Sequence, residues 1–145
     1  MKGDAAGRFF ADFNEFREVQ NTERMAAETW AKGASKLPSA KGLLGTDFEN
    51  YLTKNIGGSG EFKLSGRQFD GGVGNRWWEA KSGDYWDMIQ NNPKEMSNFK
   101  SSMGQRLGIA KENGATFELF SNSPIPQSIK EWLTTKGIPY TEILY

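Results

Sequence analysis

The sequence predicts an α/β fold with a mixed sheet, preceded by a helical extension at the N-terminus. From residue 44 onward, segments with helical spacing of apolar residues alternate with short strand-like segments, in the order α-β-β-β-α-β-α-β. Crossovers between helices and strands are typical of α/β sheets whose strands run in mixed directions. The length of 145 residues suits one domain with an extension rather than two full domains.

The N-terminal segment 4–33 is expected to be helical, because apolar residues recur there at roughly helical spacing among polar ones. These residues are Phe9, Phe10, Phe13, Phe16, Val19, Met25 and Trp30. The following segment 32–42 is small, basic and contains a proline, which is typical of a linker. The chain therefore divides into a helical lead-in and linker over 1–38 and one domain over 39–145.

The first helix of the domain is predicted to run from Thr46 to about Asn55. Thr46 and Glu49 have the spacing of a capping box, and Phe48 and Leu52 belong to an apolar stripe. Strands are then predicted at 61–64, 67–70 and 76–81, with the glycine-rich segment 71–75 as the turn before the last of them.

The second half of the domain is predicted to contain two helical regions and two strands. Apolar residues between Met88 and Ala110 suit one helix or two, with Pro93 near a start. A strand is expected at 115–120. Ser128 and Glu131 form a second capping box, which predicts a helix to Gly137 and a last strand over 138–144.

The composition excludes several kinds of chemistry. The chain has neither cysteine nor histidine, so disulfides, thiolate and imidazole zinc sites, cysteine nucleophiles and histidine-dependent hydrolysis are all excluded. An enzyme built from this chain depends on carboxylates, lysine, arginine, tyrosine, serine or main-chain amides, and its metal is a hard cation held by oxygen. The net charge is zero, so nucleic-acid binding requires a local basic patch. No apolar segment is long enough to span a membrane.

Asp70, Glu79 and Lys81 form the constellation with the clearest chemical meaning. Asp70 ends one predicted strand, while Glu79 and Lys81 lie two apart on the next and therefore share a face. In a hairpin the two carboxylates come together and repel each other, and a divalent cation removes that penalty. Two structural alternatives stay open: Asp70 caps a turn, and Glu79 pairs with Lys81 across exposed surface.

These residues resemble a known family. An Asp, a hairpin and then Glu-x-Lys is similar to the PD-(D/E)xK signature of restriction-endonuclease-like nucleases, although Phe69 stands where that signature has proline. The strings GRQFDGG (66–72), WWEAKSG (77–83) and ATFELFSNSPIPQSIKEWLTTKGI (115–138) resemble the nuclease toxin domains of bacterial polymorphic toxins, such as contact-dependent inhibition proteins. The resemblance covers roughly residues 44–144 and implies an αβββαβ core.

The resemblance also implies a metal-dependent phosphodiesterase. Asp70, Glu79, Glu49 and the carbonyl group of Ala80 would bind Mg²⁺, with Mn²⁺ as an alternative. Lys81 would orient or deprotonate the attacking water and stabilise charge on the phosphate, which requires no histidine. Gln105 is a further candidate, because some members place a helix glutamine at the site. Capping of the first helix remains the alternative role for Glu49.

Substrate contacts are expected from Arg67 and Arg76, which could bind phosphate, and from Tyr85 and Trp86, which could stack on bases from a loop after the active strand. The alternatives are solvated charge for the arginines and core packing for the aromatic residues. Core packing is the expectation for one of Trp77 and Trp78, since alternate strand residues face inward.

The expected function is a nuclease toxin used in competition between bacteria. It would be secreted or delivered from the cell surface as part of a larger toxin, act in the cytoplasm of the target cell, and be neutralised by a cognate immunity protein in its producer. DNA is the favoured substrate, and tRNA or another RNA is the alternative. Two further functions stay open: a non-catalytic binding module of the same fold, and a cellular repair or restriction nuclease.

Overall fold

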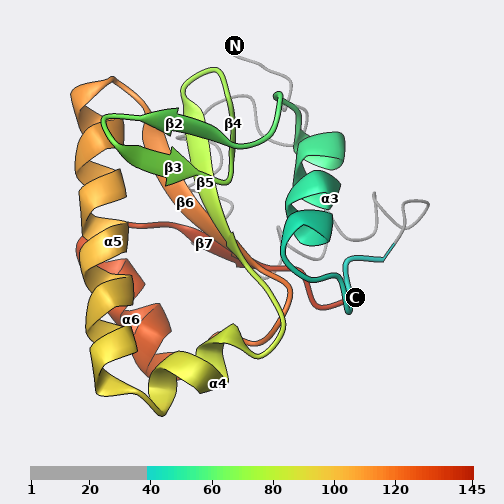
Figure 1. The fold of residues 1–145 in the computed structure, drawn as a ribbon, viewed down its shortest axis with the longest axis vertical. Helices are drawn as coiled ribbons and strands as arrows, with labels where there is room; N and C mark the ends of the chain where they lie inside the picture. Colours follow the sequence, from blue (N-terminus) through green and yellow to red (C-terminus); the bar gives the residue numbers. More distant parts are fainter. Residues whose placement is uncertain (1–38) are drawn as a thin grey trace.

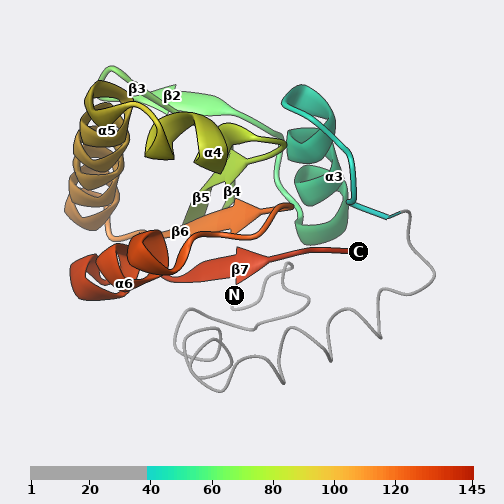
Figure 2. The same ribbon diagram turned by 90° about the horizontal axis from the view of Figure 1, so that it is seen from below.

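The computed structural model describes residues 39–145, which form three layers around a mixed sheet (Figures 1 and 2). Helix α3 (Thr46–Ile56) covers one face of the sheet. Helices α4 (Tyr85–Gln90), α5 (Pro93–Glu112) and α6 (Gln127–Lys136) lie on the other. The predicted helix over 4–33 and the lead-in over 1–38 lie outside the described residues.

The main sheet has the order β4-β5-β6-β7. Its strands are β4 (Gly71–Val73), β5 (Arg76–Lys81), β6 (Thr116–Ser121) and β7 (Tyr140–Glu142). Strand β4 is antiparallel to β5, whereas β5, β6 and β7 are parallel, which confirms the predicted α/β fold with a mixed sheet. Helices cover both faces of β6, and five of its six residues are buried for that reason.

A separate antiparallel hairpin contains β2 (Phe62–Leu64) and β3 (Arg67–Phe69). Its two-residue turn places both Ser65 and Gly66 at positive φ, 52° and 80°, as a turn matched to the strand twist requires. The Phe62 ring stacks on Phe69 within the hairpin, and the edge-on contact of Phe69 with Phe117 of β6, with centroids 5.8 Å apart, attaches the hairpin to the main core.

The segment predicted as a turn over 71–75 is mostly strand. Residues 71–73 form β4, and only Gly74 and Asn75 make the turn to β5. Glycine is required at Gly71 for packing: a Cβ there would lie 2.4 Å from Cε2 of the Trp78 indole. The prediction was wrong because glycines that admit an aromatic ring have the same sequence pattern as glycines in a loop.

The two predicted capping boxes do not form. Helix α3 follows Gly45 and α6 follows Pro126, and neither has a side-chain hydrogen bond at its cap. The amide of Gly45 instead donates to Ser82 Oγ at 2.9 Å, which ties the start of α3 to the loop after β5. The start of α5 follows the prediction: Pro93 is the first residue, and the Asn92 side chain accepts from two main-chain amides.

The buried apolar residues form two clusters, one on each face of the sheet. The larger cluster lies between the sheet and helices α4, α5 and α6, and includes Phe117 and Leu119 of β6. The smaller cluster lies under α3 and includes Trp78 and Phe120. Alternate residues of β5 and β6 therefore point to opposite cores, and Trp78 is the buried tryptophan of the predicted pair.

The remaining elements lie close to their predicted positions. The strands β2, β3, β5, β6 and β7 all overlap predicted strands, and the long helical region is divided into α4 and α5. Among the described residues, no helix is long and apolar enough to cross a membrane.

Candidate active site

Asp70 lies at the junction of two strands. It separates β3 from β4, and the pairing of Gly71 with Trp78 brings it beside the Glu79 segment of β5. Its amide donates to the Trp78 carbonyl oxygen at 3.1 Å, and its Oδ2 accepts from the Ala80 amide at 2.8 Å. The carboxylate is thus held over the middle of β5 by main-chain contacts, which make its position rigid.

Glu79 is a buried carboxylate with two cations beside it. Its side chain is only 5% exposed, Lys81 Nζ lies 3.6 Å from Oε2, and Arg106 Nε lies 3.4 Å from Oε1. Oε1 nevertheless has no hydrogen-bond donor among the described residues. Buried carboxylate oxygens are almost always hydrogen-bonded, so an oxygen in this state is suited to an additional ligand.

Glu49 approaches the same place from α3. It is half-buried, and the carboxylates of Asp70 and Glu61 both interact with it. Burial is the largest cause of the rise in its pKa to about 8, followed by repulsion from Asp70. The capping alternative for Glu49 is not observed, since no side chain caps α3. Glu61 was not among the predicted residues.

The pKa of the Glu79 carboxyl group lies close to neutral pH. Burial is the largest cause of the rise in its pKa to about 7; the Asp70 charge adds to this rise, while Lys81 and Arg106 oppose it. Asp70 therefore repels an acidic group on each side, Glu49 and Glu79. Such clustering of carboxylates with raised pKa values is frequent at functional sites.

The donor set fits a hard divalent cation. Its members are carboxylate oxygens and the Ala80 carbonyl group, the ligand types that Mg²⁺ and Mn²⁺ prefer. A cation would give Glu79 Oε1, which accepts no hydrogen bond from a described residue, a ligand contact and would reduce the repulsion around Asp70. As the side chains stand, no group of three acidic residues in 39–145 is arranged to hold a metal ion. Binding would therefore rely on Asp70 and Glu79, with adjustment of Glu49.

Arg106 reaches the carboxylates from α5, which the sequence interpretation did not foresee. Phe99, Met103 and Ala110 are the buried residues of α5, and Arg106 lies on the same stripe, at helical spacing from each. Its side chain is 13% exposed. A charged residue on an otherwise apolar stripe was the available sequence signal.

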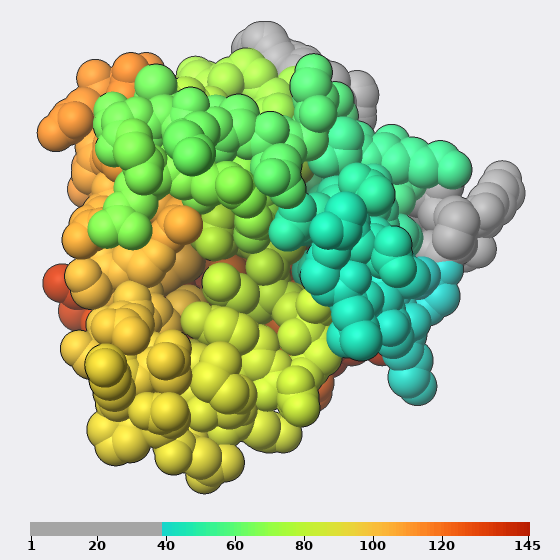
Figure 3. All heavy atoms as spheres, viewed as in Figure 1, coloured from blue at the N-terminus to red at the C-terminus, as the bar shows by residue number. Residues whose placement is uncertain are grey.

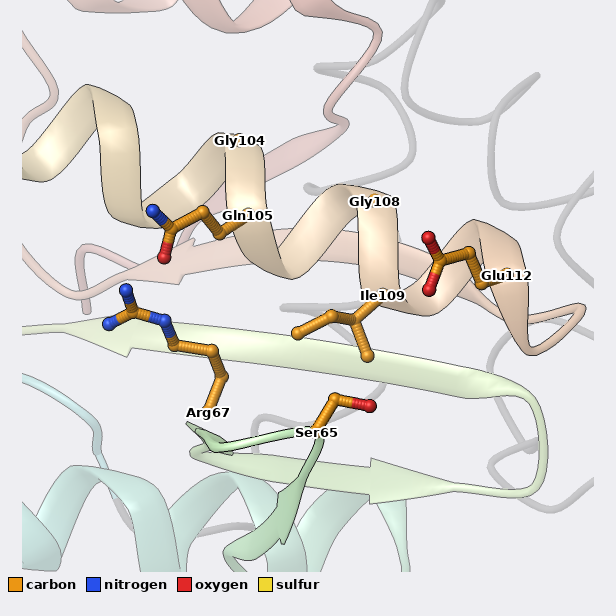
Figure 4. Close-up of a pocket in the computed structure, with 7 residues that line it drawn as sticks. All are labelled: Ser65, Arg67, Gly104, Gln105, Gly108, Ile109 and Glu112. Carbon is orange, nitrogen blue, oxygen red and sulfur yellow. The ribbon is translucent and has the colours of Figure 1, made fainter.

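Gln105, the predicted helix residue, points elsewhere. It is exposed, and its amide donates to Ser101 Oγ at 3.4 Å. It lines a shallow hollow between α5 and the β2–β3 hairpin, together with Arg67 and Gly108 (Figure 4). Its hydrogen bond runs along α5 and not toward the carboxylates. The neighbouring residue, Arg106, is the one that faces them.

Arg76 is placed in the interior. Its Nε donates to Glu118 Oε2 at 2.6 Å, and both side chains are buried in the layer under α3. Burial raises the pKa of Glu118, and Arg76 opposes that rise. This placement suits a structural ion pair between β5 and β6 and not the predicted contact with substrate.

The aromatic residues after β5 belong to helix α4 and not to the predicted loop. Trp86 is 2% exposed and donates from Nε1 to Ser121 Oγ at 2.9 Å, so it is part of the core. Tyr85 is half-buried, and Lys81 Nζ lies 4.5 Å from the centroid of its ring. Burial and the Glu79 charge raise the Tyr85 pKa to about 12. The ring thus contributes to the placement of Lys81.

In the space-filling view, one face of the molecule is bordered by α3 on one side and α5 on the other, with the β2–β3 hairpin across the top (Figure 3). The structure brings the predicted Asp70, Glu79, Lys81 and Glu49 together, because Asp70 interacts with both glutamates and Lys81 lies beside Glu79, whereas Arg76 and Trp86 are buried elsewhere.

Comparisons of the chain with protein-family models, with curated proteins and with solved structures gave no match.

Proposed function

We propose that residues 39–145 form a metal-dependent nuclease with a restriction-endonuclease-like αβββαβ core. The observation that supports this most directly is the grouping of Asp70 with Glu79 and Lys81 of β5, where the buried Oε1 of Glu79 accepts no hydrogen bond from a described residue. The order α3, hairpin strands, β5, α5 and β6 is compatible with that core.

Each residue of the site has a definable task. Asp70, Glu79, the Ala80 carbonyl group and Glu49 would hold Mg²⁺ or Mn²⁺. Such an ion, when bound, would supply positive charge and increase the acidity of water. Lys81 Nζ, between the Tyr85 ring and Glu79, would orient the attacking water and stabilise negative charge that develops on the phosphate.

The proposed substrate is DNA, and tRNA is the alternative. Arg67 is exposed on β3 and remains a candidate phosphate contact, with Gln105 across the same hollow. The proposed biological setting is a toxin delivered into a competing bacterium as part of a larger protein and neutralised by an immunity protein.

A non-catalytic role for the same fold is the second candidate, and one observation favours it. Both cations at Glu79 are already engaged, Lys81 with Glu79 and Tyr85, and Arg106 with main-chain oxygens. A purely structural site would have such contacts. The two candidates predict opposite results in one assay.

That assay incubates the purified chain with plasmid DNA and, separately, with total tRNA, in Mg²⁺, Mn²⁺ or chelator. Asp70→Asn is the test variant, because the amide oxygen can still accept from Ala80. Asp87→Asn is the matched control, since Asp87 is an exposed acid on α4. We expect metal-dependent cleavage by the wild type and the control but not by Asp70→Asn. Equal cleavage by all three, or none by a folded wild type, would contradict the nuclease.

A further inference from the structure

Arg106 joins three parts of the site through one guanidinium group. Its Nε donates to the Gln68 carbonyl oxygen at 2.7 Å, and its Nη1 donates to the carbonyl oxygen and the Oγ of Ser102. The same Nε lies 3.4 Å from Glu79 Oε1. The side chain therefore links α5 to the strand that leads into Asp70 and to the Glu79 carboxylate on β5.

Arg106 makes its hydrogen bonds and its charge contact with different partners. The N–H groups of Arg106 are directed at main-chain and hydroxyl oxygens, while its charge faces Glu79. Glu79 is thus partly neutralised, but no hydrogen bond to a described residue occupies its Oε1. A lysine has no planar fork, so it could supply the charge but not these directed contacts together.

We infer that Arg106 is a positioning residue for metal binding. It holds the Glu79 carboxylate near the Asp70 strand through its charge and leaves Oε1 without a hydrogen bond, so that this oxygen can accept a cation. The inference rests on the proposed function, and it adds that the geometry of the carboxylate pair depends on α5. Groups that orient metal ligands typically change metal affinity by 10–100-fold when they are altered.

The test is Mn²⁺ binding, measured by calorimetry on the full chain without nucleic acid. Arg106→Lys retains the charge and removes the fork, so we expect Mn²⁺ affinity to fall by about tenfold or more. Ser102→Ala removes only the hydroxyl contact of Nη1, and we expect a smaller loss in the same direction. Lys136→Gln, an exposed change in the last turn of α6, is the control and should bind as the wild type does.

Near-ultraviolet circular dichroism establishes that each variant is folded, and cleavage kinetics follow. A positioning role predicts that a saturating Mn²⁺ concentration restores much of the lost kcat in Ser102→Ala while KM for the nucleic acid is unchanged. A role in general stability alone would lower the melting temperature without changing metal affinity, and would overturn the inference.

The outcomes separate this inference from the proposed function. If the wild type binds Mn²⁺ and cleaves nucleic acid, while Arg106→Lys and Ser102→Ala bind it equally well, only the positioning role is refuted. If the wild type binds no Mn²⁺, or Glu79→Gln binds it as the wild type does, the metal site itself is refuted and the positioning role with it.

Discussion

Glu79 combines three properties that a structural carboxylate seldom has together: burial, a raised pKa and an oxygen without a hydrogen-bond donor. Burying a charge costs free energy unless it is well paired, and here the two nearby cations do not hydrogen-bond Oε1. The site therefore carries a cost to stability, which is common where a protein binds or transforms a ligand.

Glu79→Gln should separate stability from activity. The neutral amide has nearly the same shape and removes the repulsion with Asp70, so we expect the free energy of unfolding to change by no more than about 1 kcal/mol. Loss of a metal ligand should lower cleavage by roughly 100-fold or more. Urea denaturation and a cleavage assay measure the two effects. A large loss of stability with cleavage intact would contradict the assignment.

The metal-free protein should become less stable as pH rises. The folded-state pKa values of Glu79, about 7, and Glu49, about 8, lie above the ordinary value of 4.5. The folded state therefore binds protons more tightly, and this stabilisation is complete below about pH 4.5 and is lost as pH rises through 7 to 8. For Glu79 its upper limit is roughly 3 kcal/mol, because one pKa unit corresponds to about 1.36 kcal/mol.

Thermal melts between pH 5 and 9 measure this effect. We expect the melting temperature to fall over that range in chelator, and less steeply in Glu79→Gln. Mg²⁺ should raise the melting temperature most at the alkaline end, where the carboxylates are ionised. A flat or rising profile in the wild type would show that these carboxyl groups do not have raised pKa values.

At the scale of elements, β4 shows how aromatic packing determines local structure. Gly71 lies against the Trp78 indole, so Gly71→Ala forces the ring or the strand to move, and we expect a loss of about 2 kcal/mol in the free energy of unfolding. Gly104→Ala is the matched control, because nothing lies within 4 Å of a Cβ there. In that helix interior, alanine should stabilise by up to about 1 kcal/mol. Chemical denaturation of both variants tests the contrast, and similar effects would contradict the packing argument.

Sequence patterns predicted most of the elements because most have strong periodicity or strong terminators. The apolar run of β6 and the Asn92–Pro93 start of α5 are examples. Both capping boxes failed because the helices begin at or before the predicted cap residues: α3 follows Gly45, whose amide donates to Ser82 Oγ 37 residues away, and α6 follows Pro126. The proximity of Asp70, Glu79 and Lys81 could be predicted because one strand pair defines it, and the resemblance implied the approach of Glu49 from α3. The contacts of Arg106 and Glu61 with the site could not be predicted, because the sequence does not show which other elements lie next to that strand pair.

At the scale of the whole molecule, hydrogen bonds join residues at the two ends of the described region. The amides of Ala40 and Lys41 donate to the Tyr145 carbonyl oxygen, and Asn122 donates to the carbonyl oxygens of Ala40 and Leu43. The beginning and the end of this region are thus joined beside β6. The region has the connections expected of one folding unit.

A fragment of residues 39–145 should therefore fold by itself. We expect one cooperative transition in urea and retention of metal-dependent cleavage, because the described residues between Ala40 and Tyr145 already form an apolar cluster on each face of the sheet. Comparison with the full chain measures any contribution of residues 1–38. A fragment without a cooperative transition would contradict the proposed domain boundary.

Several tryptophans lie close enough to the site for their fluorescence to report on it. Trp77 and Trp78 immediately precede Glu79 in β5, one facing each core, and Trp86 follows Tyr85, whose ring lies under Lys81. Indole emission responds to nearby charge and polarity, so occupation of the carboxylates should change the fluorescence of the unmodified protein. The packing that holds the strand in place thus supplies an intrinsic optical reporter, and ligand entry can be followed in real time without any label.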